Sequence, residues 1–144
     1  MAETITIIDA VIRTATDGEF RTGTDGWVYL ALAGREFDLD TSANNFEAGA
    51  TDRFILGDGA NVNNPSRNDP RNPALDFADL DRFPAYLRFE PPDNERDDHW
   101  LLERADITVT GSSGSKAQYT ILPGDNLKLW LARDCGLKVY LKKQ

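Results

Sequence analysis

The strongest constraint on the fold of this chain is its series of short runs of β-branched and aromatic residues, each broken off by Gly, Asp, Asn or Pro. Runs of this kind are typical of β-strands joined by turns. Nine of them follow one another at short and regular spacing, at 4–12, 27–32, 36–39, 53–56, 84–89, 100–109, 119–122, 127–131 and 137–141. This spacing predicts an all-β chain folded as an antiparallel sandwich or barrel, and we expect the sandwich.

Two stretches depart from the simple strand pattern. The alternation of residues 4–7 changes phase before Ile8, which predicts a β-bulge in the first strand. Residues 57–72 are rich in Gly, Asn, Pro and Asp and are unusually long for a loop of a compact domain, and one or two helical turns are expected within 73–81. We therefore expect a single domain over residues 1–144 with a long loop insertion at about 57–82.

Composition and charge exclude several functional classes. The chain has 144 residues, of which 40% are apolar, enough to bury a hydrophobic core. Its formal net charge is -8, and the acidic surplus lies in residues 1–100, which argues against a nucleic-acid backbone as partner. One cysteine and one histidine exclude an internal disulfide and a thiolate zinc site, and leave little material for a histidine-rich metal site.

The sequence shows neither a targeting segment nor a membrane span. Its first residues lack the basic and apolar regions of a signal peptide, and no run of about 18 apolar residues occurs. We expect a soluble domain, and the sequence leaves its compartment open. Weak calcium sites fill at the millimolar calcium found outside cells, so the calcium hypothesis below favours an extracellular location.

Hard oxygen ligands concentrate in three predicted loops, each placed just before a strand. The loops precede Trp27, Phe54 and Trp100, and they carry Asp17 and Asp25, then Asn44, Asn45 and Glu47, then Asp93 to Asp98. Calcium prefers six to eight such oxygens, and loops at one end of a sandwich can supply them from distant positions. On pattern alone, ordinary solvated turns explain acidic loops more often than a metal site does.

A further polar stretch lies in the long insertion. Residues 58–63 alternate like a calcium loop, yet they lack the central glycine and closing glutamate of an EF-hand. We interpret this stretch as an ordered loop, and the sequence leaves open whether it binds a second calcium ion.

Several of these segments resemble the PLAT domain, the module named for polycystin, lipoxygenase and alpha-toxin, in a bacterial-type, single-domain version. Residues 23–30, GTDGWVYL, are similar to the family's GTDxxVyl signature, and residues 44–52, NNFEAGATD, are similar to its NxFERGxxD segment. Residues 100–109 resemble the WfLdxvxI segment, and residues 129–131 loosely resemble the closing rWL. The matches occur in family order and cover most of the chain.

The resemblance implies two four-stranded antiparallel sheets and a non-catalytic role, in which the module docks to a protein partner or peripherally to a membrane, often with Ca2+ in the loops at one end. By position, it implies that the calcium ligands are Asp25, Asn44, Asn45, Glu47 and Asp98. The chain departs from the family at Ala48, where an Arg is usual.

The resemblance also implies contact residues at the loop tips. Phe20 occupies one place where lipoxygenase-type relatives insert an aromatic side chain into lipid, so it is the expected membrane or partner contact. The second and third loops offer no aromatic at the corresponding places. We therefore expect docking to a protein partner to be the main function, ahead of peripheral lipid binding.

Two other functional classes stay open at this point. The neighbouring acids Asp97 and Asp98 suggest a carboxylate-dependent glycoside hydrolase, although adjacent residues rarely face each other across a substrate. A structural subunit of a larger assembly is the other alternative. We expect no enzyme activity, and we expect Trp27, Trp100 and Trp130 to be core residues because each lies within a strand run.

Overall fold

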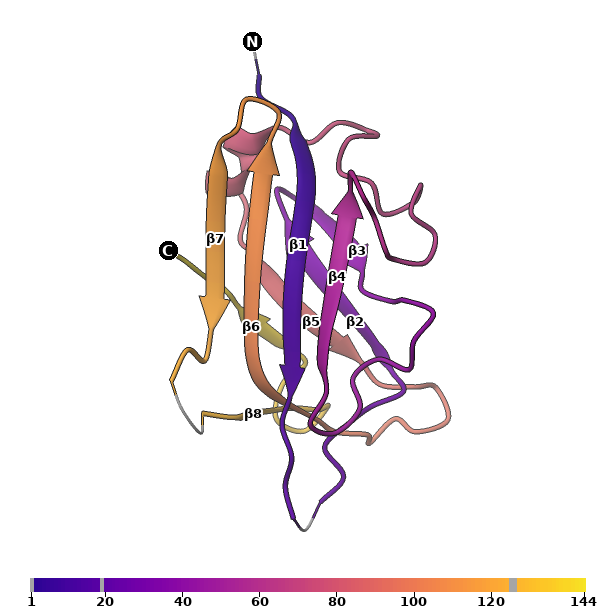
Figure 1. Cartoon of the computed structure of the whole chain (residues 1–144). Coiled ribbons are helices and arrows are strands. Elements are labelled where there is room, and N and C mark those ends of the chain that lie inside the picture. The colour runs from indigo at the N-terminus through magenta and orange to yellow at the C-terminus, as the bar shows by residue number, and fades with distance from the viewer. Residues whose placement is uncertain (1, 19, 125–126) are drawn as a thin grey trace.

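The computed structural model describes residues 2–18, 20–124 and 127–144 and confirms the predicted antiparallel β-sandwich. Two sheets pack face to face, with β1, β4, β6 and β7 in the nearer layer of Figure 1 and β2, β3 and β5 behind them. The first sheet has the strand order β10-β7-β6-β1-β4, with β8 paired to β6, and the second has the order β3-β2-β5-β9.

The strands follow the predicted runs closely. The first sheet consists of β1 (Ile5–Thr14), β4 (Thr51–Gly57), β6 (Trp100–Gly111), β7 (Lys116–Ile121), β8 (Leu129–Leu131) and β10 (Lys142–Lys143). The second sheet consists of β2 (Trp27–Leu32), β3 (Arg35–Asp38), β5 (Tyr86–Glu90) and β9 (Lys138–Tyr140). The one helix among the described residues is the 3-10 helix η1 (Phe77–Asp81), inside the expected range.

The first sheet differs from the four strands that the resemblance implied. It has six, because the short strands β8 and β10 extend it beyond β7, β6, β1 and β4. The predicted bulge is confirmed, since the register of β1 against β6 shifts between Ile5 and Ile7. All pairings are antiparallel, so each strand can bury one face and expose the other.

The core lies between the two sheets and follows the two-residue period of the strands. Trp100 is its largest fully buried side chain, with no exposed surface, as predicted. Its ring lies against Phe46 and Phe89, and its indole Nε1 donates a 2.9 Å hydrogen bond to the hydroxyl of Thr14. These contacts hold the first residue of β6 against the end of β1.

The prediction that Trp27 is a core residue is wrong. Along β2 the side chains of Val28 and Leu30 point into the core, so the strand period directs Trp27 and Tyr29 to the outer face, and Trp27 is 42% exposed. Trp130 is only partly buried. A binding role is therefore open to both tryptophans.

Candidate functional site

Three loops meet at the lower end of the sandwich in Figure 1, opposite the N-terminus. They are the 15–26 loop between β1 and β2, the 39–50 loop between β3 and β4, and the 91–99 loop between β5 and β6. Because β2 and β5 pair antiparallel, the start of β2 lies beside the end of β5. The topology thus brings together the three polar loops that the sequence singled out.

A close backbone contact joins the 15–26 and 39–50 loops. The amide of Thr24 donates a 3.0 Å hydrogen bond to the carbonyl of Phe46. A Cβ atom on Gly23 would lie 2.7 Å from that carbonyl oxygen, closer than real Cβ atoms approach. Gly23 is therefore required at the first position of the Gly-Thr-Asp sequence.

The hydroxyl of Thr24 joins the 15–26 loop to the 91–99 loop. It donates a 2.5 Å hydrogen bond to Oδ2 of Asp98 and accepts a 2.9 Å hydrogen bond from the amide of Gly26. Thr24 is buried, so these bonds are shielded from water. The predicted ligand Asp98 is thereby fixed next to the backbone that carries Asp25.

Phe46 anchors the 39–50 loop in the core. Its ring is buried, stacks on Phe54 and contacts the edge of Trp100, while its backbone has a φ of 62°, which is uncommon for a residue other than glycine. Its amide donates a 2.9 Å hydrogen bond to Asp52. With the ring held inside, Glu47 is exposed at the loop surface. Asn45 is half-buried, and its side chain accepts a 2.9 Å hydrogen bond from the amide of Thr41 and donates one of 3.3 Å to Asp52.

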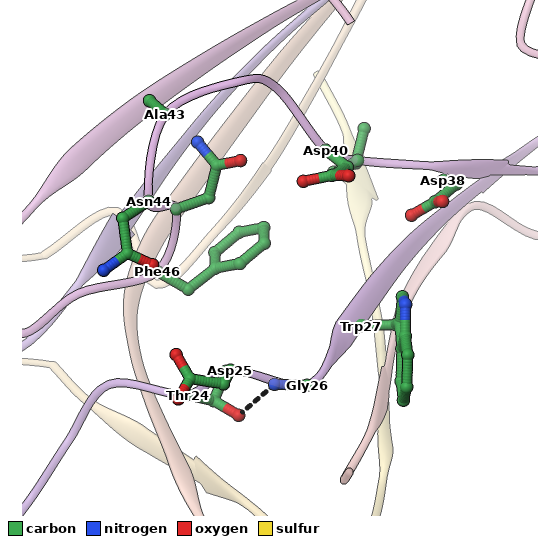
Figure 2. Close-up of a pocket in the computed structure, with 11 residues that line it drawn as sticks. Thr24, Asp25, Gly26, Trp27, Asp38, Asp40, Ala43, Asn44 and Phe46 are labelled. Atoms are coloured by element: carbon green, nitrogen blue, oxygen red, sulfur yellow. Dashed lines mark hydrogen bonds between the residues drawn. The ribbon is translucent and has the colours of Figure 1, made fainter. Parts of the chain in front are cut away.

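The structure divides the predicted ligands between two cavities that share Asp25. The first acidic cavity has a volume of about 230 Å³ and contains Asp25, Asn44 and Asn45. In Figure 2, Asp38 and Asp40 lie on one side of it and Thr24 to Gly26 lie on the opposite side.

The second acidic cavity has a volume of about 170 Å³ and contains Asp25, Glu47 and Asp98. Thr22, Thr24 and Glu95 also line it, and Arg21 places one positive charge at its wall. The two cavities are linked by a hydrogen bond from the side-chain amide of Asn44 to Oε1 of Glu47. The five predicted ligands therefore border one continuous polar region, although they do not surround a single point.

Sequence reasoning missed Asp38 and Asp40, which line the first acidic cavity. The signal was present in the sequence, because two acids separated by one residue at the end of a strand project from the same face. Burial and the nearby charges of Asp40 and Glu90 raise the pKa of Asp38 above its ordinary value of 3.8. Its buried Oδ1 has no hydrogen-bond partner within the described chain.

The long loop insertion supports this acidic strand end. The buried side chain of Asn68 accepts a 2.9 Å hydrogen bond from the amide of Asp38 and donates to the carbonyls of Asn63 and Asn64. The amide of Asn63 donates to the carbonyl of Asp40 at 2.8 Å, and its side chain donates to the Asp40 carboxylate at 3.0 Å. The insertion thus holds Asp38 and Asp40 in place.

The lining of both cavities suits a hard cation. Carboxylates, amide oxygens, hydroxyls and backbone carbonyls are the ligands that calcium prefers. One residue lining each cavity also carries a buried oxygen without a partner in the described residues, Oδ1 of Asp38 for the first and Oγ1 of Thr22 for the second. No three His, Cys, Asp or Glu side chains of the described ranges are already grouped closely enough to hold a metal ion, so a cation here needs amide and backbone oxygens as well.

Replacing Asp38 by Asn is expected to stabilise the calcium-free protein at neutral pH, by at most about 1 kcal/mol. A carboxyl whose pKa is raised on folding stabilises the fold while it is protonated, and that contribution is lost as the pH rises from 3.8 through the raised pKa. The higher free energy of unfolding of the variant should therefore be present at pH 7 and absent below pH 3.8. Thermal unfolding of both proteins across this pH range, with chelator present, measures it; an Asn variant less stable than the wild type at pH 7 would contradict it.

Phe20, the predicted contact residue, is 62% exposed in the 15–26 loop. It borders a third concavity, which we call the aromatic cleft, together with His99 and Trp130. Within the described part of the three loops, Phe20 is the only exposed Phe, Tyr or Trp side chain. Across residues 2–18, 20–124 and 127–144, no helix has the length and apolar character needed to cross a membrane.

Comparison with known proteins supports the fold. The structure is similar to the alpha toxin from Clostridium absonum, with a TM-score of 0.57 and 18% sequence identity over 99% of this chain. The chain spans about a third of that toxin, 32% of its length. No family model matches the sequence, and no curated protein matches it. Alpha toxin is one of the proteins for which the PLAT domain is named, so this match agrees with the sandwich that the resemblance implied.

Proposed function

We propose that this chain is a non-catalytic recognition module that binds calcium at the three-loop end of its sandwich. The observation that carries the proposal is the convergence of acidic and amide side chains from three separate loops on two cavities that share Asp25. The raised pKa of Asp38 supports it, because a carboxylate destabilised by burial and by the nearby charges of Asp40 and Glu90 is stabilised by a bound cation.

The residues that would hold calcium fall into two groups. Asp25, Asp38, Asp40 and the amides of Asn44 and Asn45 line the first acidic cavity. Glu47, Glu95 and Asp98 line the second, next to the orphan hydroxyl of Thr22. Bound calcium would neutralise the acidic end of the molecule and fix the three loops relative to one another. Thermal unfolding with and without calcium tests this proposal and is argued in the Discussion.

A neutralised loop end suits docking to a protein partner better than stable membrane anchoring. Phe20 supplies roughly 1.5–3 kcal/mol if it is fully buried, which is too little for stable attachment to a bilayer. The net charge of -8 also repels anionic headgroups unless calcium intervenes. We therefore propose protein docking as the main function and calcium-dependent peripheral lipid contact as the lesser one.

Sedimentation with phosphatidylserine vesicles measures the lipid contribution. We expect weak retention with calcium and none with chelator, and we expect Phe20→Ser to abolish the retention because Phe20 carries the one exposed aromatic ring among the described residues of the loops. Phe83→Ser is a matched control, since Phe83 is also exposed but follows η1, outside the three loops. Strong binding with chelator, or full binding by Phe20→Ser, would reverse the ranking of protein over lipid.

A further inference from the structure

The outer face of the second sheet carries four aromatic side chains that are not buried in the core. Trp27 and Tyr29 lie two residues apart on β2, whereas Tyr86 lies on β5 and Tyr140 on β9. The side chains of Trp27 and Tyr140 are the most accessible, with 42% and 59% of the residue surface exposed. In β1, β4, β6 and β7 of the first sheet, by contrast, every aromatic side chain is buried. The two sheets thus differ in what their strands present to solvent.

The strand register places these four rings along one diagonal, which we call the outer-face track. Residues two apart on a strand project from the same face, so Tyr29 follows Trp27. Tyr29 pairs with Arg88, which makes Tyr86 its diagonal neighbour on β5. Tyr86 pairs directly with Tyr140, and their rings meet edge to face with 6.0 Å between centroids. The track therefore crosses three strands, and a ligand that covers it has to be extended.

Two cations hold the inner rings of the track in place. The Arg88 guanidinium lies 4.2 Å from the centroid of the Tyr29 ring, and the Lys138 ammonium lies 4.3 Å from that of Tyr86. Arg88 donates hydrogen bonds of 3.0 and 2.9 Å to the two oxygens of Glu36, and the Tyr86 hydroxyl donates one of 2.6 Å to the same carboxylate. The inner rings are thus fixed before a ligand arrives, which lowers the entropic cost of binding.

The charges beside the rings balance one another. Arg88 lies 2.9 Å from Glu36 and 3.7 Å from Glu90, and Lys138 supplies the second positive charge. A charged ligand would have to compete with these ion pairs. An uncharged one would not, because a carboxylate has about four acceptor sites and a guanidinium has five donors, more than the pairs use. The track therefore favours a ligand that has hydrogen-bonding groups and no net charge.

A concavity opens beside the track, at the edge of β3. Its volume is about 360 Å³, within the usual range of about 300–1,000 Å³ for small-molecule sites. Side chains of the sheet and of the long insertion line it, namely Tyr29, Glu36, Asp38, Asn64, Arg67 and Asn68.

The groups in this concavity differ in what they can bind. The Arg67 guanidinium only donates hydrogen bonds, and it makes no ion pair or side-chain hydrogen bond within residues 2–18, 20–124 and 127–144. The carboxylates of Glu36 and Asp38, when ionised, only accept. A hydroxyl group both donates and accepts, so two hydroxyls on neighbouring carbon atoms can satisfy both kinds of group at once. The concavity therefore suits a polyhydroxylated ligand.

We propose that the outer-face track binds an uncharged oligosaccharide, with sugar rings stacked on Trp27 and Tyr140 and sugar hydroxyls bound in the concavity at Glu36 and Arg67. A pyranose ring with equatorial hydroxyls has apolar C–H faces, which pack on aromatic rings, and a polar rim. The proposal goes beyond the calcium-dependent module, because the track lies outside the three loops and needs no metal. Trp27 also lines the first acidic cavity, so the experiment is done with chelator present.

Cellohexaose, an unbranched and extended chain of β-linked glucose, is the probe. We expect millimolar cellohexaose to shift the indole N–H resonance of Trp27 saturably. The indole resonance of Trp100, which has no exposed surface, should stay unchanged. The spectrum of Trp27→Phe identifies the Trp27 resonance by its loss, and isothermal titration calorimetry measures the dissociation constant.

Variants test the two exposed rings and the concavity separately. Trp27→Ala and Tyr140→Ala should each weaken binding by about tenfold or more, whereas Trp27→Phe should retain most of it because a ring remains. Arg67→Gln should weaken binding several-fold. Leu127→Ala is the control, because Leu127 is 45% exposed, close to Trp27, but lies between β7 and β8 of the other sheet. Circular dichroism verifies that each variant is folded.

The absence of a saturable Trp27 shift at millimolar cellohexaose would overturn the proposal, as would equal affinity of the wild type and Trp27→Ala. Unchanged affinity of Arg67→Gln would overturn the role of the concavity. The matching chain of β-linked glucuronic acid should bind more weakly, since the protein has a net charge of -8, and equal affinity would overturn the assignment of an uncharged ligand. A failure to bind calcium would leave all these outcomes unchanged.

Discussion

Replacing Trp100 by Ala is expected to destabilise the domain by about 3–5 kcal/mol, which approaches the whole stability of many small domains. The indole is fully buried between the sheets and packs against Phe46 and Phe89. Its loss also leaves the buried hydroxyl of Thr14 without its indole donor. Urea unfolding followed by circular dichroism measures the change.

Trp27→Ala is the matched control for this experiment. Trp27 is also the first residue of a strand, but it lies on the outer face and is 42% exposed. We expect its replacement to change the free energy of unfolding by roughly 0.5 kcal/mol or less. Similar losses in the two variants, or wild-type stability of Trp100→Ala, would contradict the assignment of these residues to the outer face and the core. If Trp100→Ala does not fold, Trp100→Phe is expected to show an intermediate loss.

Calcium is expected to raise the melting temperature of the wild type. Ligand linkage gives about 2.7 kcal/mol when free calcium is 100 times its dissociation constant. Asp25→Ala should remove most of this shift, because Asp25 is the one acidic residue that borders both acidic cavities. The variant should unfold cooperatively without calcium, since Asp25 is exposed in a loop.

Asp58→Ala serves as the control for charge alone. Asp58 is an exposed acid of the long insertion and lines neither acidic cavity. Its calcium-induced shift should equal that of the wild type. Identical melting curves of the wild type in chelator and in millimolar calcium would refute the calcium proposal, and an equal loss in Asp58→Ala would reduce it to nonspecific screening.

The strand pattern could be predicted from the sequence because each strand buries one face. Alternation of apolar residues with polar ones determined nearly all the runs, including the bulge before Ile8. It failed at Trp27, where a large aromatic at a strand end was assumed to be buried. The period set by Val28 and Leu30 was the better guide, since it places Trp27 outside.

The site could be predicted only in part. The position of the three loops follows from the order of the strands, and the family resemblance pointed to Asp25, Asn44, Asn45, Glu47 and Asp98. The division into two cavities depends on how Phe46 and Thr24 hold the loops, which no local pattern reveals. Asp38 and Asp40 were missed because Asp38 was assigned to the strand run 36–39, and Asp40 just after it was not considered together with it.

Hydrogen bonds with Asn68 and Asn63 hold Asp38 and Asp40 at the end of β3. They couple the motion of these two acids to that of the long loop insertion. Amide hydrogens exchange with solvent when a segment opens, and hydrogen-bonded segments open as cooperative units. The amide of Asp38 can exchange only when its bond to Asn68 breaks, and opening of the 57–82 insertion breaks that bond. Slow opening of the insertion, which lies outside the three loops, would therefore set how often the Asp38–Asp40 side of the first acidic cavity comes apart.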